Sequence, residues 1–209
     1  MAATLDQLPL PSALIQAARD FHRRGWMAGT AGNLSARADA DQCWITASGL
    51  PKGSMEDADF LCVRISDGAV LERRSAGRQP SAETIIHRTL YRLFPSVRAC
   101  FHVHSVDACI AADLAPADAG GLPLPPLEML KGFGVYESAP RLALPLFANH
   151  LEVPDIAADI ERRFGAQTPR LTALMIRDHG VTVWGDSLQQ AYDRVEIIEF
   201  ILSYIARRG

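Results

Sequence analysis

Two stretches of the chain decide how it folds: VRACFHVH at residues 97–104 and LTALMIRDHG at residues 171–180. Each is a mostly apolar run of strand length that leads to histidine. Side chains two residues apart in a strand project to the same face, so we expect His102 and His104 to lie together. A second strand end would bring His179 beside them. Three neutral imidazoles with an open fourth position are the ligand set of a catalytic zinc site.

This histidine pattern also has a plainer interpretation. An HxH pair is a weak signal, and a single histidine at a strand end is more often a structural residue than a ligand. Two such segments, each followed by a small polar residue or a glycine, favour a metal site over that interpretation. On spacing alone, the site would suit a hydrolase, a lyase or a structural zinc ion.

The rest of the chain alternates helical and strand patterns. Apolar residues recur at helical spacing, and proline, glycine and serine mark the element ends. The sequence has no internal repeat and no long linker, so it predicts a single α/β domain over residues 1–209 with a central mixed or antiparallel sheet. Helices are expected at residues 11–24, 80–94, 105–113, 154–164 and 187–206, strands at 43–46, 60–65, 97–103, 142–147 and 171–177, and a loop at 115–126.

Composition narrows the class of protein. The chain is 48% hydrophobic and its formal net charge is -3, which gives no reason to expect nucleic acid binding. The four cysteines form no CxxC pair, which is typical of a reducing compartment. The N-terminus does not have the pattern of a signal peptide, and no apolar stretch has the length of a membrane span. We therefore expect a cytoplasmic protein that does not bind membranes.

Two loops rich in small residues have the chemistry of anion sites. They are GTAGNLS at residues 29–35 and ITASGLPKG at residues 45–53. Glycine lets the backbone approach an anion, while hydroxyl, amide and ammonium groups donate hydrogen bonds to it. The first loop is neither a Walker A motif nor a dinucleotide fingerprint, and taken alone it is better explained as a turn. The second loop taken alone is explained equally well as a surface turn. The candidate groups in these loops belong to Thr30, Asn33, Ser48, Gly49 and Lys52.

Two carboxylates are candidates for proton transfer. Glu83 follows Ser81 at the start of an expected helix, where free N–H groups attract anions. Glu83 is explained about as well as a first-turn acid that complements the helix dipole. Glu128 lies among apolar residues in LEMLKG, and such surroundings raise a carboxyl pKa and favour an acid/base role. The alternative for Glu128 is a solvent-facing helix residue.

Taken in order, the segments GTAGNLS, ITASGLPKG, PSAETIIH, HVHS and RDHGVTVWG resemble the class II aldolase/adducin family. The resemblance implies a three-layer α/β/α sandwich and a homotetramer with active sites at subunit interfaces. It implies one Zn²⁺ per subunit, held by His102, His104 and His179. It also implies a small sugar-phosphate substrate, with the phosphate held by Thr30, Asn33, Ser48, Gly49, Ser81 and, less strongly, Lys52.

Within this family, LEMLKG followed by a glycine-containing turn resembles the branch of methylthioribulose-1-phosphate dehydratases, which act in methionine salvage. That likeness implies dehydration of 5-methylthioribulose 1-phosphate to the 2,3-diketo-5-methylthiopentyl 1-phosphate, with Glu128 as acid/base. Glu83 matches the catalytic glutamate of the family's aldolases, although some dehydratases carry a cysteine there. The alternatives are a sugar-phosphate aldolase of the fuculose-1-phosphate type and a metal-free adducin-like interaction module, which the intact histidines disfavour.

Overall fold

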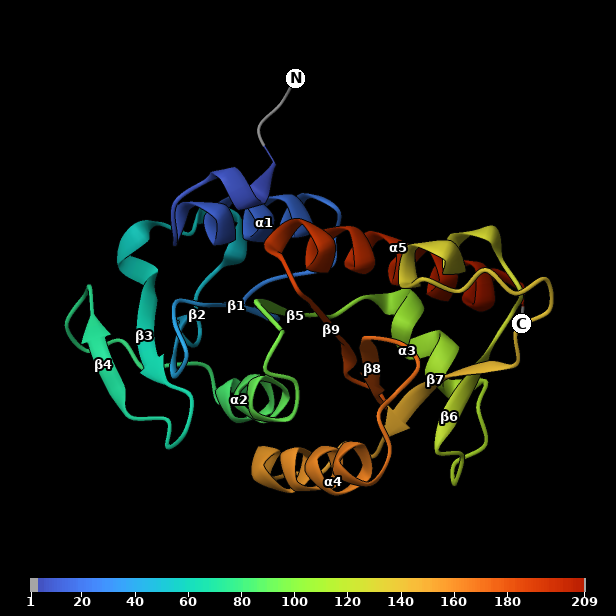
Figure 1. The fold of residues 1–209 in the computed structure, drawn as a ribbon. Helices are drawn as coiled ribbons and strands as arrows, with labels where there is room; N and C mark the ends of the chain where they lie inside the picture. Colours follow the sequence, from blue (N-terminus) through green and yellow to red (C-terminus); the bar gives the residue numbers. More distant parts are fainter. Residues whose placement is uncertain (1–3, 209) are drawn as a thin grey trace.

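The fold is built on a nine-stranded sheet, seen in a computed structural model that describes residues 4–208 (Figure 1). The strand order is β4-β3-β2-β1-β5-β9-β8-β7-β6. All neighbouring pairs are antiparallel except the parallel pair β7–β8, so the expected mixed sheet is confirmed. The strands are β1 (Asn33–Arg37), β2 (Gln42–Thr46), β3 (Phe60–Arg64), β4 (Val70–Arg73), β5 (Ala99–Val103), β6 (Gly121–Leu124), β7 (Leu142–Phe147), β8 (Ala173–Ile176) and β9 (Gly180–Gly185).

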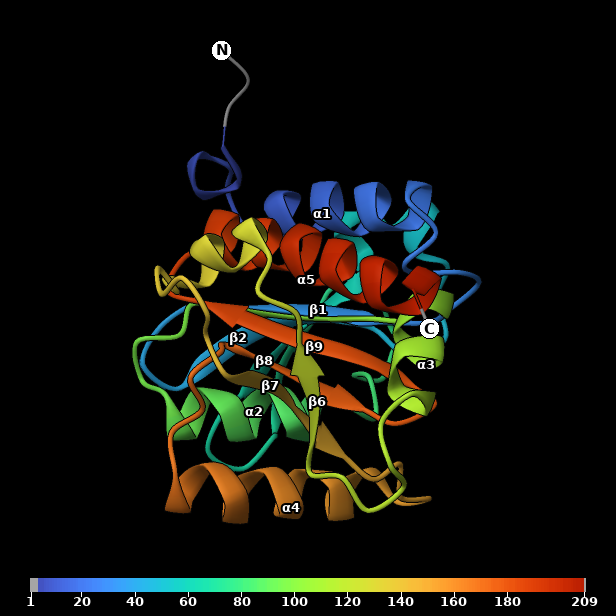
Figure 2. The same cartoon turned by 90° about the vertical axis from the view of Figure 1, so that its right-hand side faces the viewer.

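Helices cover both faces of the sheet, which confirms the three-layer α/β/α arrangement (Figures 1 and 2). One face carries α1 and α5, with α3 packed against α5, and the other carries α2 and α4. The α-helices are α1 (Ser12–Arg23), α2 (Thr84–Leu93), α3 (Val106–Asp113), α4 (Val153–Ala166) and α5 (Leu188–Arg208). Short 3-10 helices are η1 (Leu5–Gln7), η2 (Lys52–Ser54), η3 (Asp57–Asp59) and η4 (Glu128–Phe133).

Two apolar cores hold these layers together, one on each face of the sheet. Helix α1 buries Leu14 and Phe21, and α5 buries Val195 and Ile198, all at the spacing that places them on one helix face. Each large side chain buried in this way contributes about 1.5–3 kcal/mol. Strand β5 lies between these cores and is buried along its whole length. The strand that carries His102 is therefore held rigidly from both sides.

Four strands differ from the sequence-based expectation. The expected loop at 115–126 contains β6, which pairs with β7 at the edge of the sheet. Pro123 lies within β6, and proline is tolerated in an edge strand because that strand has one unpaired side. Strand β1 begins in the GTAGNLS segment and β9 lies in RDHGVTVWG, and neither was expected as a strand. Strand β4, at the opposite edge of the sheet from β6, was also not expected. Among the described residues, no helix is both long and apolar enough to cross a bilayer.

Candidate active site

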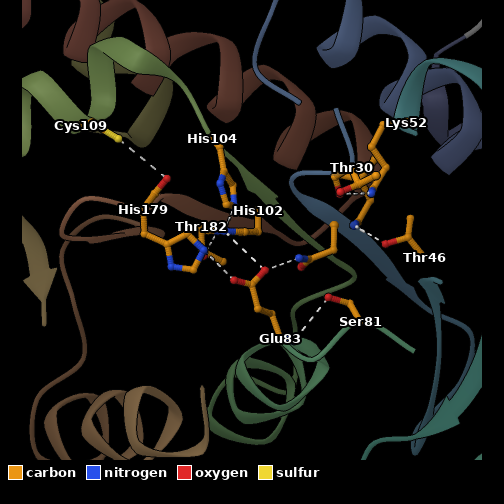
Figure 3. A network of polar contacts seen from close by, with 12 residues as sticks. Thr30, Thr46, Lys52, Ser81, Glu83, His102, His104, Cys109, His179 and Thr182 are labelled. Carbon is orange, nitrogen blue, oxygen red and sulfur yellow. Dashed lines mark hydrogen bonds and ion pairs between the residues drawn. The ribbon is translucent and has the colours of Figure 1, made fainter. Parts of the chain in front are cut away.

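The three histidines meet at one end of the central strands (Figure 3). His102 lies in β5, His104 follows that strand, and His179 lies in the turn between β8 and β9. Strand β9 pairs with β5, so this turn lies beside the end of β5. The ring centroids are 4.6–5.0 Å apart, and the ring planes are inclined by 75–83°. The predicted meeting of the two histidine segments is therefore confirmed.

Two glycines allow the backbone to bring these rings together. A Cβ on Gly180 would lie 2.2 Å from the Val103 carbonyl oxygen, so only glycine fits beside β5 immediately after His179. A Cβ on Gly32 would lie 2.8 Å from the His102 carbonyl oxygen, and Gly32 has a positive φ of +76°. Close contact of neighbouring backbones on both sides of β5 thus sets the position of His102.

Glu83, at the start of helix α2, adds a carboxylate to this cluster. Helix α2 begins at Thr84, so Glu83 occupies the N-cap position, yet its side chain makes no capping hydrogen bond. Its Oε1 atom lies 2.8 Å from Nε2 of His179, and its Oε2 atom lies 3.5 Å from Nε2 of His102. The Asn33 amide donates a hydrogen bond to Oε2. The Glu83 carboxylate therefore contacts the histidines, and complementing the helix dipole is not its only role.

The protonation states of these groups suit a cation. Burial lowers the pKa of His102 to about 4, although the charge of Glu83 opposes this, and burial lowers the pKa of His104 to about 3. Burial by itself would raise the pKa of Glu83, but His102, His179 and the Asn33 amide outweigh it and hold this pKa well below its ordinary range. Near neutral pH, His102 and His104 therefore offer neutral imidazole nitrogens and Glu83 an ionised carboxylate, the forms that a divalent metal requires of its ligands.

The donor set fits a metal ion with imidazole and carboxylate ligands. One potential ligand atom from each of Glu83, His102, His104 and His179 lies within 4.8 Å of the others. Nδ1 of His102 lies 2.9 Å from Oγ1 of Thr182, an outer contact that turns Nε2 towards the cluster. Sequence reasoning missed Thr182, although its place two residues after Gly180 on the paired strand was visible in RDHGVTVWG.

A buried lysine, Lys52 in η2, is a second unusual group of the structure. Lys52 is 1% exposed, and its Nζ atom donates hydrogen bonds of 2.8 Å to the carbonyl oxygens of Thr30 and Leu50 (Figure 3). Within residues 4–208 no carboxylate forms a salt bridge with it. Burial lowers its pKa to about 8, while Glu83 acts to raise it. A buried ammonium group without a carboxylate partner is an unusual feature, because burying an unpaired charge costs free energy.

The loops expected to bind phosphate lie next to one another. Lys52 connects the Thr30 loop to the loop that follows β2 through the two carbonyl contacts. The N–H of Ser48 donates to the Gln79 carbonyl at 2.9 Å, and the N–H of Ser81 donates to the Thr46 carbonyl at 3.3 Å. These contacts place the segments that carry Ser48, Gly49 and Ser81 side by side. The Asn33 amide nitrogen is instead engaged by Glu83.

Glu128 lies outside the histidine cluster. It is in η4, its side chain is 83% exposed, and its carboxylate pairs with Lys131 at 2.6 Å. The expectation of apolar surroundings for this carboxylate is wrong for the single chain. The neighbouring apolar residues Leu130 and Phe133 are buried towards the core, which leaves Glu128 on the outside of η4.

The comparison with known families identifies the fold. The profile described as Class II Aldolase and Adducin N-terminal domain matches residues 12–205. The chain belongs to this family. It is 50% identical to a protein named methylthioribulose-1-phosphate dehydratase from Microcystis aeruginosa, over 92% of this chain and 93% of that one. A protein of the same name from Leptospira biflexa is 42% identical, over 90% and 92% of the two chains.

Solved structures agree with this assignment. The structure of YgbL from Escherichia coli, described as a putative aldolase/epimerase/decarboxylase, aligns with a TM-score of 0.77 and 25% identity. The alignment covers 95% of this chain and 88% of that one. The expected class II aldolase-like fold is therefore confirmed, and the metal-ligating candidates lie together in it.

Proposed function

We propose that this protein is a metal-dependent hydro-lyase that dehydrates 5-methylthioribulose 1-phosphate to 2,3-diketo-5-methylthiopentyl 1-phosphate in methionine salvage. The observation that carries this choice of reaction is the 50% identity, over 92% of the chain, to a protein named methylthioribulose-1-phosphate dehydratase. The site supports the proposal because it combines a cluster of potential metal ligands with a buried cation suited to a phosphate.

His102, His104 and His179 are proposed to hold one Zn²⁺ per subunit. When bound, the metal would polarise the substrate carbonyl at C-2 and so make the proton on C-3 easier to remove. Glu83 adds a negative charge beside the three imidazoles, at 2.8 Å from His179. In this proposal it helps to hold the cation and to keep the His179 ring in place.

Proton transfer is assigned to Glu128. A carboxylate base would take the proton from C-3, and the resulting acid, directly or through water, would protonate the departing C-4 hydroxyl group. Loss of one water leaves an enol that tautomerises to the diketone, so the step needs no redox cofactor. Because Glu128 is exposed in the single chain, we propose that it works at a subunit interface, where a second chain would bury it.

The phosphate is proposed to bind between the two small-residue loops. Lys52 would supply the positive charge there, and backbone N–H groups and hydroxyls of Thr30, Ser48, Gly49 and Ser81 would donate hydrogen bonds. Asn33 would contribute mainly through Glu83, because its amide nitrogen already donates to that carboxylate.

A homotetramer with interface sites is also proposed. Helix α3 starts directly after His104 and Ser105, and its outer face exposes Val106, Ile110 and Leu114 to 75%, 43% and 49%. These residues recur at helical spacing, and such an apolar stripe marks a contact surface. A subunit that packs there would lie next to the histidine cluster. We propose a cytoplasmic location for this assembly, because four cysteines without a CxxC pair are typical of a reducing compartment.

The test is to incubate the purified protein with 5-methylthioribulose 1-phosphate and to follow near-ultraviolet absorbance of the diketone. Metal content and oligomeric state are measured on the same sample, by elemental analysis and by light scattering. Formation of dihydroxyacetone phosphate and an aldehyde would instead identify an aldolase. Absence of both activities, together with no bound metal, would identify a metal-free interaction module.

A further inference from the structure

Two further polar side chains, His87 and Tyr91, follow Glu83 along helix α2. Glu83, His87 and Tyr91 are four residues apart and therefore share one face of the helix. Opposite them, Oγ of Ser35 in β1 lies 2.6 Å from Nδ1 of His87 and 2.8 Å from the hydroxyl of Tyr91. Ser35 and His87 are 0% exposed and Tyr91 is 1% exposed. Three polar groups thus form a closed network inside the protein.

This network is the second of two side-chain contacts between α2 and β1. The first contact is the hydrogen bond from the Asn33 amide to Glu83. Asn33 and Ser35 project to the same face of β1, just as Glu83 and His87 share a face of α2. In the neighbouring strand, Asn33 pairs in register with His102. The two contacts therefore connect the start of α2, where Glu83 lies, to the strand pair β1–β5, which carries His102.

Burying these polar groups costs more free energy than a purely structural contact would require. Burial lowers the pKa of His87 to about 4, opposed by the charge of Glu83, so the ring is buried in its neutral form. Among the residues described, nothing forms a hydrogen bond with Nε2 of His87. Apolar side chains of similar volume would pack here without an unsatisfied nitrogen. Polar groups that break such a packing rule next to a reactive site point to a functional role.

We propose that His87, held by Ser35 and Tyr91, is a positioning residue that fixes the direction of the Glu83 carboxylate against the three histidines. The inference rests on the metal site of the proposed function. His87 lies one helical turn after Glu83, so it controls how the first turn of α2 approaches β1. If that turn moves, the contacts of Glu83 with His179 and Asn33 lengthen together.

The test compares His87→Phe, Ser35→Ala and Tyr91→Phe with the wild-type protein loaded with Co²⁺. The visible absorption of Co²⁺ reports the geometry of its ligands, independently of turnover. We expect His87→Phe to change that spectrum, to weaken Co²⁺ binding, and to lower kcat about tenfold with KM nearly unchanged. His87→Asn retains a polar atom near the Nδ1 position and should restore most of the spectrum and rate.

Leu90→Val is the matched control, because Leu90 is buried in the same helix and packs in the apolar core. It should lower the stability without changing the spectrum, the Co²⁺ affinity or kcat. If His87→Phe and Tyr91→Phe also lower only the stability, the network is structural and the inference is wrong. If His87→Phe does not fold, Ser35→Ala and Tyr91→Phe decide the question. A wild-type protein that binds Co²⁺ but forms no diketone would refute the proposed reaction, while the spectra would still test His87.

Discussion

The buried ammonium group of Lys52 gives the sharpest test of the proposed phosphate site. Its pKa is lowered by burial from 10.5 to about 8. Below pH 8 the lysine therefore carries a charge that opposes folding, and this opposition fades as the pH rises from about 8 towards 10.5. Allowing for partial screening by solvent, the penalty is about 2–3 kcal/mol. An anion bound beside Lys52 would offset it.

Inorganic phosphate should therefore stabilise the wild-type protein. At ten times its dissociation constant, a ligand specific for the folded state adds about 1.4 kcal/mol. For a chain of this size that corresponds to a rise in Tm of about 3–5 °C. Lys52→Met keeps most of the aliphatic stem and removes the charge, and its Tm should hardly respond to phosphate. Differential scanning fluorimetry across a phosphate titration, at constant ionic strength, measures both.

Lys131→Met is the matched control, since Lys131 is the other lysine of the chain and its side chain is 52% exposed. It should keep the full response to phosphate. An equal rise in Tm for wild type and Lys52→Met would refute the reasoning, because the bound anion would then not depend on the buried charge.

Three further outcomes are expected. Thr182→Val removes the polar partner of His102 at nearly constant volume and should weaken metal affinity about 10–100-fold, as measured by competition with a chelator. Gly180→Ala forces a Cβ against a carbonyl oxygen of β5 and should lower metal occupancy, while Gly165→Ala, which meets nothing within 4 Å, should not. Because burial lowers the pKa of His87 to about 4 from 6.5, its contribution to stability is present above pH 6.5 and is lost as the pH falls towards 4. His87→Phe should remove that part of the acid-side slope in urea unfolding measured at a series of pH values.

The histidine cluster could be predicted from the sequence because its causes are local. The i, i+2 spacing of His102 and His104 needs only an extended strand to bring both rings to one side. The position of His179 needed one long-range fact, the pairing of β9 with β5, which no local pattern contains. The order of the family segments implied only that the three histidines meet, and the structure confirmed that meeting.

The remaining differences come from residues whose surroundings are set by tertiary contacts. Glu83 has the same local sequence whether it complements a helix dipole or faces the histidines, so only the approach of α2 to β5 distinguishes the two. Glu128 lies among apolar neighbours in sequence, but those neighbours turn to the core and leave it exposed. Because of Pro123, the segment that forms the edge strand β6 was expected to be a loop. Proline is excluded from central strands but is tolerated at an edge.

The two sides of the histidine cluster also delimit a long excursion of the chain. Between His104 and His179 the polypeptide leaves the cluster, forms α3, β6, η4, β7, α4 and β8, and returns to the same point. A cation bound by both histidines would hold the two ends of this segment together. If Glu128 has the role proposed above, substitutions in η4 would change the reaction while the strands that carry the histidines stay in place.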